Sequence, residues 1–154
     1  MASYFTNRGA KLLLDYGLGA TTAPSTYYAI LLTNNSAPTV DSNTIADCEE
    51  IVAGNGYTSG GNSYTKAQIF PDAAVQNNTS NYSTLKIEEV HFNAAGGTVP
   101  VPPNAAIRWI AITTNEATVA DRQIIAVLDL GTTYTIPDGK RLLAATIAGK
   151  LAQP

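Results

Sequence analysis

Few residues in this chain could carry out nucleophilic or acid–base chemistry. It has one histidine, His91, and one cysteine, Cys48. A serine–histidine–aspartate triad would have to use His91, and no Gly-x-Ser-x-Gly turn accompanies it. A structural zinc site takes about four Cys or His ligands at fixed spacings, which this sequence does not supply. We therefore predict that the chain is not an enzyme and has no catalytic residues, metal site or cofactor.

Carboxylates occur in two adjacent pairs, Glu49–Glu50 and Glu88–Glu89. Two carboxylates catalyse glycoside hydrolysis when both face one substrate. Neighbours on a strand point to opposite faces of a sheet, so we interpret both pairs as solvated charges on strand edges. The negative charge of the first pair raises a thiol pKa, which indicates that Cys48 is unreactive. We also expect a local turn ion pair between Asp121 and Arg122.

Four glycines, at positions 54, 56, 60 and 61, resemble a phosphate-binding loop only superficially. Their spacing matches neither the dinucleotide-binding nor the P-loop pattern, and no amphipathic helix follows to offer its N-terminus to an anion. We interpret this segment as a flexible hairpin or arm.

The composition excludes two classes of partner. The net charge is −3, and Lys140–Arg141 is the only adjacent basic pair, whereas a nucleic-acid backbone requires clustered cations. No apolar run approaches the roughly 20 residues that span a bilayer, and no secretion signal is evident. We expect neither nucleic-acid nor membrane binding. Charged residues make up only 14% of the chain, against about 25% in typical domains, which mildly favours surfaces that contact other proteins.

One short helix is predicted near the N-terminus. Thr6 or Asn7 can cap it, and Ala10, Leu13 and Leu14 follow helical spacing before two stop glycines. Such a short helix must pack on its own domain or on a neighbouring molecule.

After Pro24 the chain shows short apolar runs separated by turn-forming residues, a pattern typical of strands. The strongest runs are 27–33, 107–113 and 123–130, and weaker runs cover 48–53, 64–70, 85–92 and 142–151. A shift of the alternation at Glu88–Glu89 predicts a β-bulge. Polar loops are expected at 34–43 and 71–83. The proline-rich segment 96–104 is expected to be an edge or loop, and 137–139 a turn.

This pattern predicts an all-β fold, a β-sandwich of jelly-roll type, with one short N-terminal α-helix. Helices do not alternate with strands, which disfavours parallel α/β folds. The chain has 154 residues, a length that suits one domain. We expect an N-terminal segment with the helix at 1–23 and one sandwich domain at 24–154.

Tyrosine is plentiful, with eight copies, and its ring with a polar tip is favoured at protein interfaces. Some of these rings could instead stack on carbohydrate. The proline-rich segment is extended and loses little entropy on docking. Our candidate interface residues are Tyr4, Phe5, Tyr57, Val99, Pro100, Val101, Pro102 and Pro103.

Several short motifs carry a family resemblance. Tyr4-Phe5-Thr6-Asn7-Arg8-Gly9-Ala10, Leu12-Leu13-Leu14 and the run PSTYYAILLT at 24–33 resemble the opening of small virion proteins of tailed bacteriophages. Asn55-Gly56-Tyr57, the segments 109–113 and 124–130, and the closing IPDGKRL at 136–142 are similar to later elements of that family. The similarity covers nearly the full chain. Where relatives often carry a charged continuation after Gly-Tyr, this chain has Thr58-Ser59-Gly60-Gly61.

The resemblance implies a capsid decoration (cement) protein that bridges and stabilises major capsid subunits. Such a protein would be assembled in the bacterial cytoplasm, lie on the outer capsid surface and bind as a homodimer or homotrimer. The alternative within the family is a tail-fibre or baseplate adhesion module that binds host surface glycans. A third hypothesis, a hydrolase built on a β-sandwich, requires a pocket that brings His91 beside an acid and a nucleophile.

Overall fold

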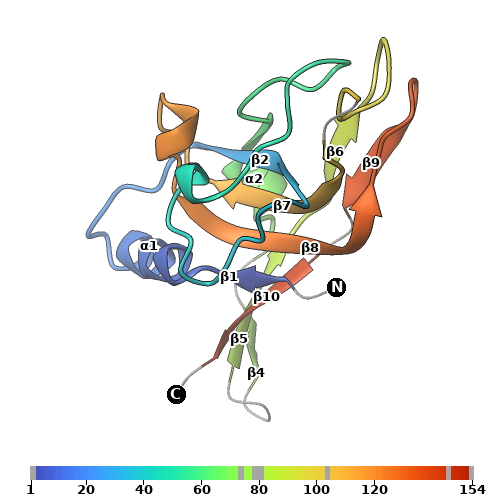
Figure 1. The fold of residues 1–154 in the computed structure, drawn as a ribbon. Helices are drawn as coiled ribbons and strands as arrows, with labels where there is room; N and C mark the ends of the chain where they lie inside the picture. Colours follow the sequence, from blue (N-terminus) through green and yellow to red (C-terminus); the bar gives the residue numbers. More distant parts are fainter. Residues whose placement is uncertain (1–2, 73–74, 78–81, 103–104, 145–146, 153–154) are drawn as a thin grey trace.

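The computed structural model describes residues 3–72, 75–77, 82–102, 105–144 and 147–152 (Figure 1). Most of its regular structure is antiparallel β-sheet, with one main helix, as the sequence predicted. The elements are β1 (Tyr4–Phe5), α1 (Asn7–Gly17), β2 (Thr26–Thr33), the 3-10 helix η1 (Ile45–Asp47), β3 (Asn62–Thr65), α2 (Lys66–Ile69), β4 (Val75–Asn77), β5 (Tyr82–Ile87), β6 (Val90–Asn93), β7 (Ile107–Thr113), η2 (Val119–Asp121), β8 (Ile124–Tyr134), β9 (Arg141–Ala144) and β10 (Ile147–Ala152).

The main sheet has five antiparallel strands in the order β1-β8-β7-β2-β3. Its three central strands are the three strongest runs in the sequence. Leu31 pairs with Ile110, which pairs with Leu128, and all three belong to one buried cluster. Residues of the opposite parity, such as Ile30 and Ala111, belong to a second buried cluster. Because both faces of these strands are buried, they are apolar without strict alternation.

Two smaller sheets complete the described fold, with strand orders β10-β5-β4 and β6-β9. Figure 1 shows the first of them extending away from the five-stranded sheet. β5 joins the body at its last residue, Ile87, which is buried.

Helix α1 begins where the sequence predicted, with Thr6 as its N-cap. The Thr6 Oγ1 accepts a hydrogen bond from the Gly9 N–H at 2.9 Å. Gly9 and Leu12 face β8, and a Cβ added at Gly9 would lie 1.9 Å from the carbonyl oxygen of Ile125. The helix therefore lies directly on a strand backbone, with room for no side chain at that point. It packs on its own chain.

The predicted strand at 48–53 was wrong. This segment makes only an isolated bridge, between Leu32 and Glu50, with hydrogen bonds from Thr33 N–H to Glu49 O and from Ile51 N–H to Leu31 O. β3 occupies the other half of the same β2 edge, so the segment has only a short length of edge to pair with.

The predicted strand at 64–70 was only partly right, because β3 ends at Thr65 and α2 follows. The Thr65 Oγ1 accepts from the Gln68 N–H at 3.3 Å, and the Gln68 Oε1 accepts from the Thr65 N–H at 2.8 Å. This reciprocal pair is a capping box, and its Thr-x-x-Gln spacing can be read in the sequence.

The bulge expected at Glu88–Glu89 is instead a break between two strands. β5 ends at Ile87 and pairs with β10, whereas β6 begins at Val90 and pairs with β9. The run 142–151 likewise contributes to both β9 and β10, and the expected loop 71–83 includes β4 and the start of β5. The chain passes from one small sheet to the other between β5 and β6, and again between β9 and β10. This explains both the shift of alternation at Glu88–Glu89 and the division of the C-terminal run into two strands.

Two irregular segments agree with their predictions. The described part of 96–104 forms no strand and makes one isolated bridge, between Val99 and Ile136. The turn at 137–139 closes with a hydrogen bond from Lys140 N–H to Pro137 O at 3.0 Å.

Candidate functional site

Several of the candidate interface side chains are part of the core. Phe5, Val99 and Pro100 are buried, and Tyr57 is only 5% exposed. Because these side chains pack within the chain, they are not exposed for contact with a partner, contrary to our expectation from the sequence. The cause is tertiary: β1 pairs with β8, and Val99 bridges to Ile136.

The remaining candidate interface residues lie nearer the surface. Tyr4 is half-buried, and its hydroxyl donates to the Pro38 carbonyl at 2.7 Å. Val101 is half-buried and Pro102 is exposed, whereas Pro103 lies outside the described residues. Of the original set, Pro102 offers the most exposed side chain in the described structure.

The glycine-rich segment is a fixed loop, which corrects the expectation of a flexible arm. The Tyr57 hydroxyl donates to Glu50 Oε1 at 2.7 Å and accepts from the Leu31 N–H at 3.2 Å. The same carboxylate accepts from the Gly60 N–H at 2.6 Å and from the Ser59 hydroxyl at 3.0 Å. Burial, followed by the nearby Glu50 charge, raises the pKa of Tyr57 far above its usual value. Glu50 therefore organises this loop and is not the solvated edge charge that we expected.

Arg122 holds the same loop from the other side. It is 8% exposed, its Nη1 donates to the Gly60 carbonyl at 2.7 Å, and its Nε donates to the Glu116 carbonyl at 3.2 Å. The guanidinium carbon lies 3.7 Å from the centre of the Tyr28 ring, a cation–π arrangement. The expected ion pair with Asp121 is not formed, because the Arg122 side chain points inward to these carbonyls.

His91 lies on the exposed face of β6, opposite Val90 and Phe92, as predicted. Its backbone is held by the Tyr64 hydroxyl, which accepts from the His91 N–H at 2.9 Å and donates to its carbonyl at 3.1 Å. The cleft beside it is lined by Asn62, Ser63, Tyr64, Gln68 and His91. Among these described residues there is a hydroxyl beside the imidazole but no acid to orient it.

Cys48 is half-buried, and burial raises the pKa of its thiol, with a smaller contribution in the same direction from the Asp47 charge. A hydrogen bond involving Ser42 acts in the opposite direction. The raised thiol pKa agrees with our expectation from the sequence. Its principal cause, however, is burial, and the charge that contributes is that of Asp47 and not those of Glu49 and Glu50. The thiol form therefore dominates at neutral pH, which disfavours nucleophilic reactions.

Within the described residues, no group of three or more His, Cys, Asp and Glu side chains is arranged to hold a metal ion. Neither does any helix there have the length and apolar character needed to cross a membrane.

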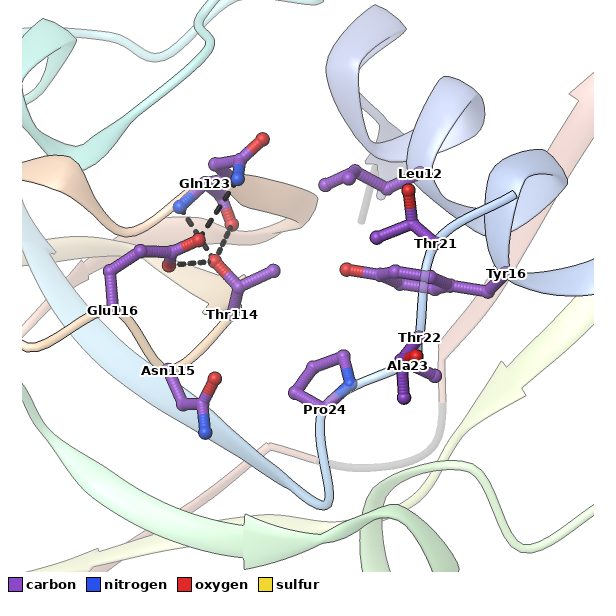
Figure 2. A pocket seen from close by; sticks show the side chains of 10 residues that line it. All are labelled: Leu12, Tyr16, Thr21, Thr22, Ala23, Pro24, Thr114, Asn115, Glu116 and Gln123. Atoms are coloured by element: carbon purple, nitrogen blue, oxygen red, sulfur yellow. Dashed lines mark hydrogen bonds between the residues drawn. The ribbon is translucent and has the colours of Figure 1, made fainter. Parts of the chain in front are cut away.

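A second cleft, of about 320 Å³, lies between α1 and the connection from β7 to β8 (Figure 2). Helix α1 contributes Leu12 and Tyr16, and the segment 21–24 lies on the same side. The opposite wall is formed by Thr114, Asn115, Glu116 and Gln123. The two walls are at least ninety residues apart in sequence, so the cleft exists only because α1 packs on β8.

A hydrogen-bond network fixes the polar wall of this cleft, which we call the Glu116 cleft. One Glu116 oxygen accepts from the Thr114 hydroxyl, and the other accepts from Gln123 Nε2 at 2.9 Å. The Gln123 Oε1 in turn accepts from Arg8 Nε. Burial alone would raise the pKa of Glu116, but hydrogen bonds from Thr114, Gln123 and the backbone outweigh it, so the pKa is lowered. Glu116 is therefore a carboxylate at neutral pH.

This carboxylate predicts a pH effect on stability. Because the pKa of Glu116 is lower in the folded chain, its ionised form stabilises the fold above the unfolded-state pKa, and that contribution is lost as pH falls through the lowered pKa. We expect the urea midpoint of Glu116→Gln to fall less than that of the unmodified chain between about pH 6 and about pH 3. An equal fall in both proteins would contradict the role assigned to this network.

The outer face of α1 carries a surface that the sequence analysis did not identify. Leu14 lies on α1, and Leu18, one helical turn later, is the residue that caps the helix C-terminus. They are 61% and 82% exposed, and the Leu18 N–H donates to the Leu14 carbonyl at 2.9 Å. We call these two residues the Leu14–Leu18 pair. Helical spacing had grouped Leu14 with Ala10 and Leu13, but Gly9 and Leu12 are the residues that face β8. Successive residues of a helix are rotated by about 100°, so a residue two positions after a buried one points to nearly the opposite side. With Leu12 known to be buried, this rotation places Leu14 on the exposed face.

No protein-family model, curated protein or solved structure matches this chain.

Proposed function

We propose that this chain is a structural protein of a tailed-phage virion, specifically a head decoration (cement) protein that binds the major capsid protein on the outer capsid surface. The observation that carries the proposal is the exposed Leu14–Leu18 pair at the C-terminal end of α1. The motifs at 4–10 and 24–33 support the same class of protein through their resemblance to small virion proteins.

The two faces of α1 have separate roles in this proposal. Gly9 and Leu12 attach the helix to β8, so the helix is held rigidly in place. The opposite face presents Leu14 and Leu18 to the surroundings. Apolar residues at i and i+4 are the anchors by which a helix docks into a groove on a partner. Single exposed leucines are ordinary on protein surfaces, but we propose that these two, one turn apart at the end of a fixed helix, act together as the contact with the partner.

The three-stranded sheet β10-β5-β4 could provide a second contact with a neighbouring subunit in this proposal. This sheet extends from the body (Figure 1), as a segment that bridges two capsid subunits would. We also propose that copies associate as dimers or trimers and that the sheets form a jelly-roll sandwich. Many copies on one shell would convert modest individual contacts into strong overall attachment.

The double substitution Leu14→Ser/Leu18→Ser tests this function. Burying a leucine side chain contributes about 1.5–3 kcal/mol, so losing both should weaken binding to purified heads more than about 100-fold. Both side chains are exposed, so the free energy of unfolding should change by less than about 1 kcal/mol. Cosedimentation with purified heads measures binding, and urea denaturation measures stability.

Val52→Ser is the matched control, because Val52 is 54% exposed but lies outside α1. It should leave binding unchanged. Undiminished binding of the double variant would refute the role of α1. Cryo-electron microscopy of whole particles tests the location: regular density across the head supports decoration, whereas copies confined to the tail would favour the adhesion-module alternative.

A further inference from the structure

We propose that the Glu116 cleft binds a single neutral sugar residue. This activity goes beyond the proposed structural role and does not depend on where in the virion the chain lies. The cleft volume of about 320 Å³ is at the lower end of the roughly 300–1,000 Å³ typical of small-molecule sites.

The polar groups of the cleft suit a ligand that carries several hydroxyls. A carboxylate offers about four acceptor positions, and Glu116 already accepts from the side chains of Thr114 and Gln123 and from nearby backbone, so a ligand hydroxyl would share its oxygens with these donors. Figure 2 shows the Tyr16 hydroxyl pointing across the cleft toward Glu116 and Thr114. Asn115 is exposed at the margin, and its amide can both donate and accept. Adjacent hydroxyls on a sugar ring match such a mixture of acceptors and donors.

The helix side of the cleft supplies an apolar surface. Ala23 and Pro24, which are half-buried, provide most of this surface, because Leu12 beside them is almost fully buried. A sugar ring presents C–H groups as well as hydroxyls, so it can contact this apolar wall while its hydroxyls reach the opposite polar wall. A simple inorganic anion would use neither surface well, because the cleft places a carboxylate on its polar wall.

The charged groups around the cleft already have hydrogen-bond or ion-pair partners within the chain, which favours a neutral ligand. Lys11 forms an ion pair with Asp15 one turn along α1. Arg8 binds the Gln123 amide, and that amide binds Glu116. A cationic ligand would compete with this arrangement, whereas a neutral polyol adds hydrogen bonds without adding charge.

The polar wall is also preorganised. The Gln123 N–H donates to the Thr114 hydroxyl oxygen at 2.8 Å, and the Thr114 N–H donates to the Gln123 carbonyl at 3.1 Å. Both residues adjoin the buried ends of β7 and β8. A wall fixed in this way loses little conformational entropy when a ligand binds.

The test is an NMR titration of the isolated, ¹⁵N-labelled full chain. The probes are methyl α-glucoside, methyl α-galactoside, methyl α-mannoside and N-acetylglucosamine, with methylguanidinium as a cationic comparison. We expect at least one sugar to cause saturable chemical-shift changes of the amide resonances of Tyr16, Thr114, Glu116 and Gln123, with a dissociation constant of about 1 mM. Tyr16→Phe should weaken that binding about tenfold, because it removes one hydroxyl contact, and Glu116→Gln should weaken it at least as much.

Glu89→Gln is the control, because Glu89 is an exposed acid outside the cleft, and it should bind like the unmodified chain. Three results would each overturn the proposal: no sugar shifting the cleft resonances, methylguanidinium shifting them when sugars do not, or unweakened binding by folded Tyr16→Phe. The titration uses the isolated chain without phage heads, so its failure would refute sugar binding without bearing on the proposed decoration role.

Discussion

Replacing Gly9 by alanine is expected to lower the free energy of unfolding by about 3 kcal/mol. The added Cβ would lie 1.9 Å from the Ile125 carbonyl oxygen and 2.5 Å from its carbonyl carbon. These are backbone atoms of a central strand, so no rotamer change relieves the overlap, and α1 must move away from β8. Alanine is intrinsically the better helix former by about 1 kcal/mol, so helix propensity alone predicts the opposite sign. Urea denaturation measures the difference.

Gly17→Ala is the matched control for this prediction. Gly17 is the last residue of the same helix, and a Cβ added there would meet nothing within 4 Å. We expect it to be neutral or to stabilise the chain by about 0.5 kcal/mol. Equal effects of the two substitutions would show that α1 is not held against β8 at Gly9.

Replacing Arg122 by alanine is expected to cost about 3 kcal/mol of folding free energy. The substitution removes charge-assisted hydrogen bonds, which contribute about 1.5–3 kcal/mol each, from the carbonyls of Gly60 and Glu116. It also removes the guanidinium that covers the Tyr28 ring. Lysine should recover only part of this loss, because its single ammonium cannot reproduce the fork of donors. Thermal and urea denaturation measure both variants.

Arg108→Ala is the control for the loss of an arginine. Arg108 forms an ion pair with Asp129 at 2.9 Å and lies 5.7 Å from the centre of the Trp109 ring, but its side chain is partly exposed. Partly exposed ion pairs contribute about 1 kcal/mol or less, so this loss should be clearly smaller. If Arg108→Ala were as damaging as Arg122→Ala, the buried contacts of Arg122 would not be the cause.

Arg122 also links two regions that are far apart in the sequence. Its Nη1 binds the glycine-rich loop at Gly60, and its Nε binds Glu116, which forms the polar wall of the cleft. A change at Arg122 is therefore expected to disturb both the loop and the Glu116 cleft. This connection joins residues more than fifty positions apart.

The sequence alone determined the elements whose signals are local. Thr6 caps α1 because it directly precedes the helix and its hydroxyl oxygen can accept a hydrogen bond from a backbone N–H of the first turn. The turn at 137–139 follows from the backbone preferences of Pro137 and Gly139. The runs at 27–33, 107–113 and 123–130 became β2, β7 and β8 because their unbroken apolar character suits strands buried on both faces. His91 was placed on the correct face of β6 by strand alternation alone.

Only the tertiary structure decided what depends on distant partners. It buried Phe5, Tyr57 and Val99, turned Arg122 inward, and divided the run at Glu88–Glu89 between two sheets. It also selected Leu12 as the buried side of α1, which left Leu14 and Leu18 exposed. The physical reason is that pairing and burial depend on which segments meet in space. Local residue patterns fix backbone preference, but they do not specify the opposing surface.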